Sequence, residues 1–314
     1  MYQTEILALT PAGLGRAASL LRSDELVAFP TETVYGLGGD ARSDIAVARI
    51  FEAKGRPRFN PLIVHVPDIV AARDIALFDD TAINVAAAFW PGPLTLVLPV
   101  RPGANLSPLV NADLASVAIR VPAHPAAQAL LQAFGGALAA PSANPSGRIS
   151  PTRAQHVIDG LSGRIAAILD GGICDVGLES TIVGLTGTPT LLRPGGIPVE
   201  ALEAMFGQSL PFGGDAVTPN APGQLASHYA PNARLRLNVS TPNQGETYIG
   251  FGPALLTLSA TFDLVESAAN LFHILRTADH LAGVNGSIAI APIPDHGLGR
   301  AINDRLRRAA APRS

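Results

Sequence analysis

The chain has 314 residues, of which 47% are hydrophobic and 15% are charged, and its formal net charge at pH 7 is −3. Globular chains carry about 25% charged residues, and this lower share excludes a long disordered or coiled-coil protein. A net charge this close to zero gives the chain no general electrostatic attraction to nucleic acid or to an anionic membrane. No apolar run reaches the roughly 18 residues of a membrane-spanning helix and the N-terminus lacks a signal-peptide pattern, so we expect a cytoplasmic protein without membrane partners.

The cysteine and histidine residues of the sequence show no metal-binding pattern. Cys174 is the only cysteine, which excludes an intramolecular disulfide and a cysteine-based zinc site. The seven histidines show no H-E-x-x-H or comparable spacing. We therefore predict no dedicated protein metal site.

The first informative segment runs from residue 25 to residue 39. Residues 25–29 have the pattern of a buried strand, and residues 30–39 are polar, small and rich in glycine. Residues 36–41 formally match a dinucleotide-binding pattern, but that pattern needs its glycines directly between a strand and a helix. A tight turn is the favoured interpretation.

A basic connection follows the next helix. Residues 43–54 predict a helix with Ser43 or Asp44 as N-cap and Gly55 as its end, and residues 62–66 predict a strand. The connection carries Lys54, Arg56 and Arg58, and Lys54 is the only lysine among 22 basic residues. A compact ammonium enters a crowded anion site more readily than a guanidinium does. A stray surface lysine is the alternative, but three cations within five residues indicate a local anion site.

The remaining elements alternate between strands and helices. This pattern predicts an α/β domain with a mixed, twisted sheet. A capping box, Thr152-Arg153-Ala154-Gln155, is expected to begin one of the helices. The predicted strands are 95–98, 117–121, 137–140, 166–169, 181–185 and 190–192, and the predicted helices are 81–89, 125–134, 152–161 and 199–206.

Residues 207–232 break this alternation, because they contain many prolines and glycines without periodic apolar positions. We interpret them as a linker between a domain at 1–206 and a small α/β domain at 233–314. The second domain has no charged cluster like that at Lys54, so we place the chemistry in the first. Its predicted strands are 234–239, 247–251 and 287–291, and its predicted helices are 264–281 and 298–310.

Polar residues gather at predicted strand ends, where α/β proteins bind ligands. Ser142 and Asn144 follow the strand 137–140, and no G-x-S-x-G elbow surrounds Ser142, so hydrogen bonding is favoured over a nucleophilic role. His65 inside an apolar strand is usually a core histidine. Arg120 inside another strand needs an anionic partner, for which an acidic side chain is the default and a ligand carboxylate the alternative.

Taken together, these motifs resemble the YrdC-like L-threonylcarbamoyladenylate synthases. The match covers about residues 8–206, and the linker sequence 227–231 resembles the longer, two-domain form of the family. The resemblance implies a YrdC-like mixed twisted sheet with helices, followed by a small Rossmann-like α/β domain. The motifs that carry it are residues 29–37, 54–57, 61–62, 91–95, 119–122, 141–144, 179–182 and 192–195.

The resemblance implies that L-threonine, bicarbonate and ATP, the last with Mg²⁺, give threonylcarbamoyl-AMP and pyrophosphate. The product would serve downstream enzymes that modify the adenosine next to the anticodon of tRNA, and weak binding of double-stranded RNA is also implied. The linker would cover the site and shield the product from water. The implied catalytic residues are Lys54, Arg56, Ser142 and Asn144. The implied threonine-binding residues are Thr31, His65, Arg120, Ser142 and Ser180, with Arg120 pairing the carboxylate. The implied ATP-binding residues are Lys54, Arg58, Ser116, Ala140, Ser150, Arg193 and Tyr229.

Two other functional classes are open at this point. An RNA-binding module would suit a basic site, but the net charge and an aromatic content of 5% argue against extended nucleic-acid contact. A serine hydrolase centred on Ser142 would need a histidine base, and the sequence ties no histidine to Ser142.

Overall fold

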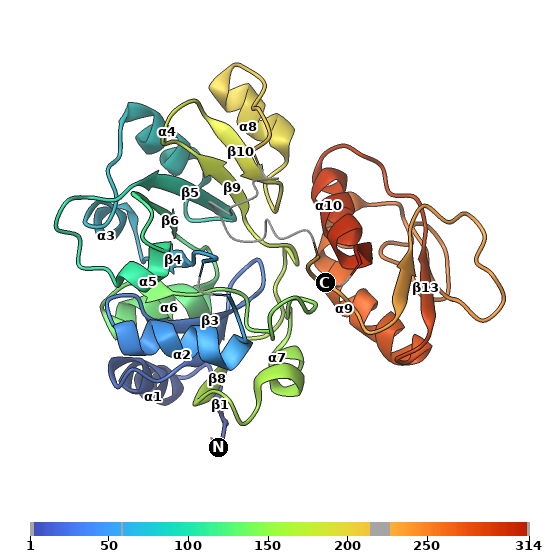
Figure 1. Ribbon diagram of the computed structural model, residues 1–314, viewed down its shortest axis with the longest axis horizontal. Coiled ribbons are helices and arrows are strands. Elements are labelled where there is room, and N and C mark those ends of the chain that lie inside the picture. The colour runs from blue at the N-terminus through green and yellow to red at the C-terminus, as the bar shows by residue number, and fades with distance from the viewer. Residues whose placement is uncertain (1–2, 58, 214–226, 313–314) are drawn as a thin grey trace.

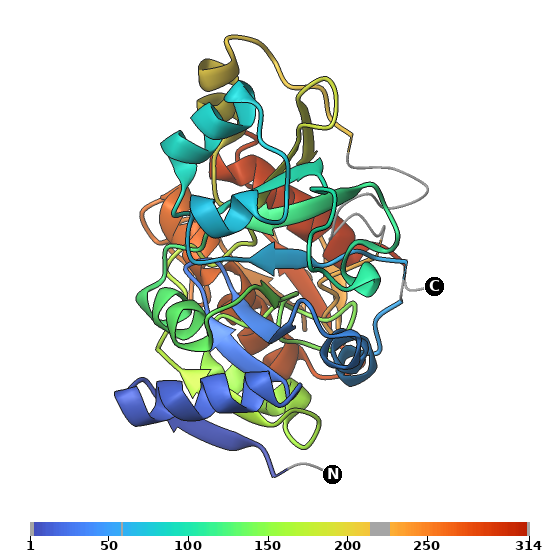
Figure 2. The ribbon, with the colours of Figure 1, turned by 90° about the vertical axis from the view of Figure 1, so that its left-hand side faces the viewer.

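A computed structural model describes residues 3–57, 59–213 and 227–312, and it contains two units that lie side by side (Figure 1). The large unit is built on a ten-stranded mixed sheet and the small unit on a three-stranded parallel sheet. The predicted fold class, a mixed twisted sheet with helices plus a small second α/β unit, is confirmed. Viewed from the left of Figure 1, the small unit lies behind the large one (Figure 2).

The elements of the large unit alternate along the chain as predicted. Its strands are β1 (Glu5–Ala8), β2 (Val27–Pro30), β3 (Tyr35–Asp40), β4 (Ile63–His65), β5 (Leu94–Pro99), β6 (Ser116–Arg120), β7 (Leu138–Ala139), β8 (Ala167–Asp170), β9 (Thr181–Gly184) and β10 (Thr190–Arg193). Its helices are α1 (Pro11–Arg22), α2 (Asp44–Lys54), α3 (Ile69–Arg73), α4 (Asp80–Phe89), α5 (Pro108–Asn111), α6 (Pro125–Phe134), α7 (Ala154–Leu161) and α8 (Val199–Phe206).

The sheet has the strand order β1-β8-β2-β3-β7-β4-β6-β5-β9-β10. Side chains alternate between its faces, as β2 illustrates: Val27 and Phe29 pack with α1 and α6, whereas Ala28 packs with α2. The same alternation puts His65 on the face of its neighbour Ile63, and Arg120 on the face of Ala118. Polar side chains from separate strands thereby reach one side of the sheet.

The tight turn expected at residues 36–41 is wrong, because residues 35–40 form the strand β3. β3 pairs antiparallel with β2, with Gly38 opposite Val27 and Gly36 opposite Phe29. A Cβ atom on Gly38 would lie 2.8 Å from Cε1 of Phe29. The glycines therefore serve close packing under a large ring rather than a change of chain direction.

Replacing Gly38 with Ala should lower the free energy of unfolding by about 1–3 kcal/mol, because the added methyl group overpacks the core beneath Phe29. Urea-induced unfolding measures the change. Gly15→Ala is the matched control, since nothing lies within 4 Å of the added Cβ and Gly15 is exposed in α1. That substitution should instead stabilise the chain by about 0.5–1 kcal/mol. Equal effects at both positions would contradict the packing role of Gly38.

Helix starts follow the predicted signals in one case and not in another. Ser43 caps α2 by accepting a hydrogen bond from the Ala46 amide, and Gly55 ends the helix at a φ of 61°. The capping box expected at Thr152 is wrong, because α7 begins only at Ala154 and its N-cap, Arg153, makes no side-chain hydrogen bond. The Thr152 amide instead donates to Nδ1 of His156.

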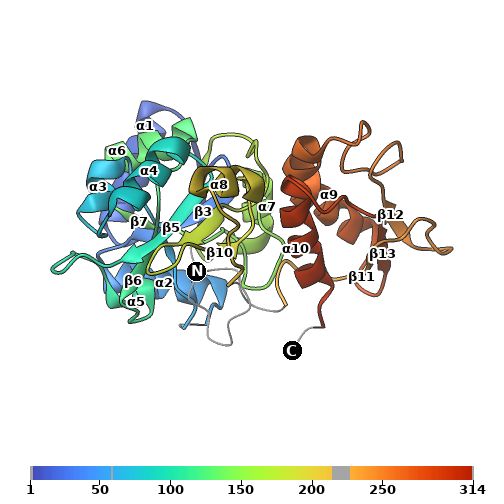
Figure 3. The same ribbon diagram turned by 90° about the horizontal axis from the view of Figure 1, so that it is seen from above.

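The small unit places two helices against the large one. Its elements are β11 (Arg234–Arg236), β12 (Thr247–Ile249), α9 (Leu264–Ala282), β13 (Ser287–Ile290) and α10 (Leu298–Ala310), and its sheet order is β11-β13-β12. Figures 1 and 3 show α9 and α10 on the side that faces the large unit, with the sheet on the far side.

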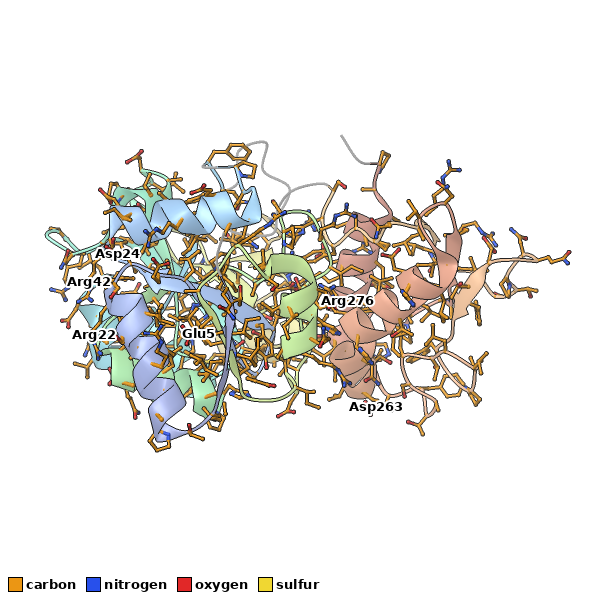
Figure 4. All side chains as sticks on the ribbon, turned by 90° about the horizontal axis from the view of Figure 1, so that it is seen from below. Glu5, Arg22, Asp24, Arg42, Asp263 and Arg276 are labelled. Carbon is orange, nitrogen blue, oxygen red and sulfur yellow. The ribbon has the colours of Figure 1, made fainter. Side chains whose placement is uncertain are left out.

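The two units share one hydrophobic cluster. Val34, Ile149 and Leu178 of the large unit belong to the same buried cluster as Phe272 of α9 and Ile302 of α10. Arg276, labelled in Figure 4 at the junction between the units, donates from α9 to the carbonyl of Ile149. The predicted linker includes residues 214–226, which lie outside the described residues. Within the described chain, no helix combines the length and apolarity needed to cross a membrane.

Candidate active site

A polar pocket lies where the large unit meets the small one. Its walls come from segments far apart in the sequence: the β2–β3 connection and β3, the α2–β4 connection, β4, β6, the segment after β7, the residues just before β9, the end of β10 and the end of the linker. The lining residues are Thr31, Thr33, Val34, Gly36, Arg56, Ile63, His65, Arg120, Ala140, Pro141, Ser142, Glu179, Ser180, Arg193, His228 and Tyr229.

Arg120 is held by three partners at one end of the pocket. Its guanidinium donates to Glu32 Oε1 at 2.6 Å, to Thr33 Oγ1 at 2.8 Å and to the Gly92 carbonyl at 3.1 Å. The acidic partner foreseen for a buried arginine is therefore Glu32. These contacts use three of the five N–H groups of a guanidinium, so the group is fixed in orientation and retains donor capacity toward the pocket.

His65 projects into the pocket as an uncharged ring. Burial, together with the nearby charge of Arg120, lowers its pKa to about 3. Its Nδ1 atom is buried and has no hydrogen-bond partner among the described residues. A neutral imidazole in this position can accept or donate one hydrogen bond to a ligand without adding charge.

The free energy of unfolding should fall as the pH drops below about 6.5. In the unfolded chain an ordinary histidine binds a proton near pH 6.5, whereas His65 in the folded chain stays neutral to about pH 3. The unfolded state gains the proton first, so His65 adds a slope of up to about 1.4 kcal/mol per pH unit. Urea unfolding between pH 4.5 and 7 measures the slope, and His65→Phe should reduce it. An unchanged slope in that variant would contradict a buried neutral His65.

Lys54 lies behind the pocket wall, at the last turn of α2. It is buried, and its Nζ atom donates to the carbonyls of Ser142, at 2.5 Å, and Asn144. Burial and the neighbouring Arg56 hold the pKa of Lys54 well below its usual range. The ammonium thus fixes the loop after β7, and a neighbouring anion would restore its ordinary tendency to carry charge.

Two arginines line the pocket beside this loop. Arg56 donates to the carbonyls of Asn60 and Pro61, while Arg193 donates to the carbonyl and the hydroxyl of Ser180. Burial lowers the pKa of each guanidinium to about 10, which leaves both charged at neutral pH. Ser180 also shares a 2.7 Å hydrogen bond with Thr95. The pocket therefore offers fixed cations and oriented hydroxyl groups.

The end of the linker forms one wall. His228 and Tyr229 both line the pocket, and their rings stack with centroids 4.1 Å apart. Tyr229 is 2% exposed and its ring also lies 5.6 Å from that of Phe272 on α9. The Ala230 amide donates to the Gly147 carbonyl, which ties the linker to the large unit.

The structure brings together most, but not all, of the predicted site residues. Those that line the pocket are Thr31, Arg56, His65, Arg120, Ala140, Ser142, Ser180, Arg193 and Tyr229. Lys54, Asn144 and Ser150 lie behind its wall: Asn144 accepts from Lys54, and Ser150 donates to Glu179. Ser116 lies elsewhere, in a separate groove with Pro99 and Thr186, and Arg58 is outside the described residues.

For the serine-hydrolase alternative, the described residues supply no base next to Ser142. Within the described part of the chain no histidine hydrogen bonds to the Ser142 hydroxyl, and His65 is the only histidine besides His228 among the lining residues. The same described residues contain no group of three His, Cys, Asp or Glu side chains placed to hold a metal. Ser142 instead offers its carbonyl to Lys54.

Comparison with known proteins decides the family. Residues 19–195 match a family model described as telomere recombination (Sua5, YciO and YrdC), and residues 197–311 match the C-terminal domain of threonylcarbamoyl-AMP synthase. The chain is 42% identical to threonylcarbamoyl-AMP synthase of Bacillus subtilis, over 99% of this chain and 96% of that protein. The chain belongs to the threonylcarbamoyl-AMP synthase family.

A second curated relative and a solved structure, both from Pyrococcus abyssi, extend the match. The threonylcarbamoyl-AMP synthase of Pyrococcus abyssi is 41% identical over 94% of this chain and 93% of that one. A crystal structure of P. abyssi Sua5 with L-threonine superposes with a TM-score of 0.90, at 37% identity and 98% coverage of both chains. The chain thus has the two-domain Sua5 form of this synthase family.

Several residues that line this pocket were not assigned from the sequence. Glu32, Thr33, Glu179 and His228 line it. Glu32 lies in the motif at residues 29–37, and Glu179 lies in the motif at residues 179–182. The need of a buried arginine for an anionic partner is the signal that could have indicated Glu32. His228 adjoins Tyr229 in the linker motif.

Proposed function

We propose that this pocket forms threonylcarbamoyl-AMP and pyrophosphate from L-threonine, bicarbonate and ATP. The observation that carries the proposal is the convergence of fixed cations and hydroxyl groups from seven separate segments on one pocket of a chain in this family. The relative from P. abyssi has been solved with L-threonine, which supports threonine as a ligand of this pocket.

The threonine end is proposed to be the Arg120 side. Arg120, already oriented by Glu32 and Thr33, supplies the remaining guanidinium donors to the threonine carboxylate. Neutral His65 and the hydroxyl groups of Ser142 and Ser180 face the same space and suit the amine and hydroxyl of threonine. Thr31 completes this end of the pocket.

The phosphate end is proposed to be the Arg56 and Arg193 side, with Lys54 behind the loop and Tyr229 beside it. Both acidic residues of the lining have arginine partners, Glu32 with Arg120 and Glu179 with Arg305. A Mg²⁺ ion that accompanies ATP therefore fits as an ion held by phosphate oxygens and water rather than by these carboxylates. It would neutralise part of the triphosphate charge.

The proposed chemistry needs positioning and charge neutralisation rather than a protein nucleophile. The amine of threonine adds to bicarbonate with loss of water and gives a carbamate. A carbamate oxygen then attacks the α-phosphorus of ATP, and pyrophosphate leaves. Fixed guanidinium groups stabilise the charge that develops on the phosphorus oxygens, and the pocket holds the two reactants in line.

The product is a mixed anhydride, so it needs an acceptor. We propose that enzymes transferring threonylcarbamoyl groups to the adenosine next to the tRNA anticodon consume it in the cytoplasm, where ATP and tRNA are present. The wall formed by His228 and Tyr229 suits protection of this product from water. Weak binding of double-stranded RNA stays a prediction, which a titration at physiological salt would check.

Pyrophosphate release by the purified chain tests the proposal. Release should require ATP, L-threonine and bicarbonate together, and the omission of any one should abolish it. Release from ATP without threonine would contradict the proposed reaction. Serine in place of threonine is the matched substrate control, because it keeps the carboxylate and amine and lacks only a methyl group.

A further inference from the structure

A charged residue of the small unit contacts a residue that lines the pocket. Arg305 on α10 is 1% exposed, and its Nε atom donates to Glu179 Oε2 of the large unit at 2.8 Å. Its Nη1 atom donates to the Pro194 carbonyl at 2.8 Å and to Asp304 at 2.7 Å. Three oxygens, two of them from the large unit, thus fix one guanidinium across the boundary.

Glu179 connects this guanidinium to the pocket. Its carboxylate faces the pocket lining, and its Oε1 atom accepts a 2.6 Å hydrogen bond from Ser150. Burial raises the pKa of Glu179, but the charges of Arg305 and Arg193 outweigh this effect and the pKa is lowered overall. Glu179 is therefore a carboxylate, and Arg305 compensates a negative charge that would otherwise repel a triphosphate.

Tyr229 is the second residue of the pocket lining that Arg305 contacts. The Arg305 guanidinium lies over the Tyr229 ring, 5.4 Å from its centroid, as in a cation–π contact. The ring of Phe272 on α9 stacks with the same tyrosine. The small unit thus supports a pocket wall from behind, through two side chains that do not themselves line the pocket.

A role in stability alone does not account for this arrangement. A buried ion pair contributes little net stability compared with apolar side chains of the same volume. Here the Arg305–Glu179 pair joins the two units, and Glu179 lines the pocket. We propose that Arg305 is a positioning residue through which the C-terminal unit sets the affinity of the pocket for ATP, by neutralising Glu179 and supporting Tyr229.

This inference rests on the proposed function for the identity of its ligand, so its test measures equilibrium ATP binding by calorimetry beside turnover. In the full-length chain, Arg305→Met should weaken ATP binding at least tenfold and raise KM for ATP, while KM for threonine stays within twofold. Arg305→Met combined with Glu179→Gln should recover most of the lost ATP affinity, because the uncompensated carboxylate is gone.

Arg308→Met is the matched control. Arg308 lies one turn further along α10 and pairs with Asp304 at 3.1 Å, so its loss removes a similar buried guanidinium without a contact to Glu179. Its ATP affinity should stay within twofold of wild type. Thermal unfolding of each variant separates stability from binding. If Arg305→Met does not fold, Arg305→Lys takes its place and should weaken ATP binding at least threefold.

The outcomes separate this inference from the proposed function. Unchanged or tighter ATP binding in the Arg305 variants would overturn the inference, and so would equal weakening in Arg308→Met. No recovery in the double variant would overturn the charge-neutralisation role. A wild-type chain that binds ATP but releases no pyrophosphate would contradict the proposed function, and the binding comparison would still decide the role of Arg305. A wild-type chain that binds no ATP would overturn both.

Discussion

Pyrophosphate formation should fall about 10²–10³-fold when Lys54 is replaced by Met, the loss typical of removing one preorganised group that stabilises developing charge. Lys54 is buried at the end of α2, and its ammonium holds the carbonyls of Ser142 and Asn144. Removing it subtracts a cation beside the proposed phosphate site and releases the loop that carries Ser142. Steady-state pyrophosphate release at saturating threonine and bicarbonate measures the effect.

Met is chosen because it keeps most of the apolar volume of the lysine side chain. The two carbonyls left without their donor should also lower the free energy of unfolding, by about 1–3 kcal/mol for each. Lys54→Arg is the charge-preserving control, and we expect it to remain impaired because a planar guanidinium is larger than an ammonium. Full activity in Lys54→Met would remove Lys54 from the proposed catalytic group.

Replacing Arg120 with Met should destabilise the chain by about 3–5 kcal/mol, since it leaves the buried Glu32 carboxylate without its partner. It should also raise KM for threonine far more than KM for ATP, because Arg120 faces the proposed threonine end of the pocket. Urea unfolding and the two KM values together measure these effects.

The double variant Arg120→Met with Glu32→Gln is the control for this prediction. It removes the unpaired charge, so stability should return to within about 1–2 kcal/mol of wild type. KM for threonine should stay high, because the donor to the threonine carboxylate is still missing. Recovery of threonine affinity in the double variant would show that Arg120 acts only by holding Glu32.

Local signals in the sequence predicted the local structure well. The helices at 125–134, 199–206 and 298–310 begin and end where the pattern placed them, and Ser43 and Gly55 bound α2 as expected. The strand β3 was missed because its glycines are typical of turns, whereas in the structure these glycines pack closely against Phe29, Leu26 and Ile50. The elements α1, α3, α5 and β1 were not predicted.

Nine of the predicted site residues line one pocket, but the contacts among them could not be predicted. Lys54 stood out as the only lysine, and the strand-end motifs indicated which segments meet. Which charges pair depends on contacts across long sequence separations: Arg120 with Glu32, and Arg305 with Glu179, 126 residues apart. We expected the chemistry in the first domain because the second has no charged cluster like that at Lys54, and a contact such as that of Arg305 with Glu179 becomes visible only in the folded chain.

The single lysine gives this chain a built-in spectroscopic reporter. A sample grown with isotope-labelled lysine would yield one side-chain ammonium signal, and it would come from the group that holds the Ser142 carbonyl behind the pocket wall. No assignment by mutagenesis would be needed to follow its protonation as ATP or threonine is added. The same residue makes amine-directed chemical labelling selective: beyond the N-terminus, the rate of modification would report how often the buried ammonium becomes accessible.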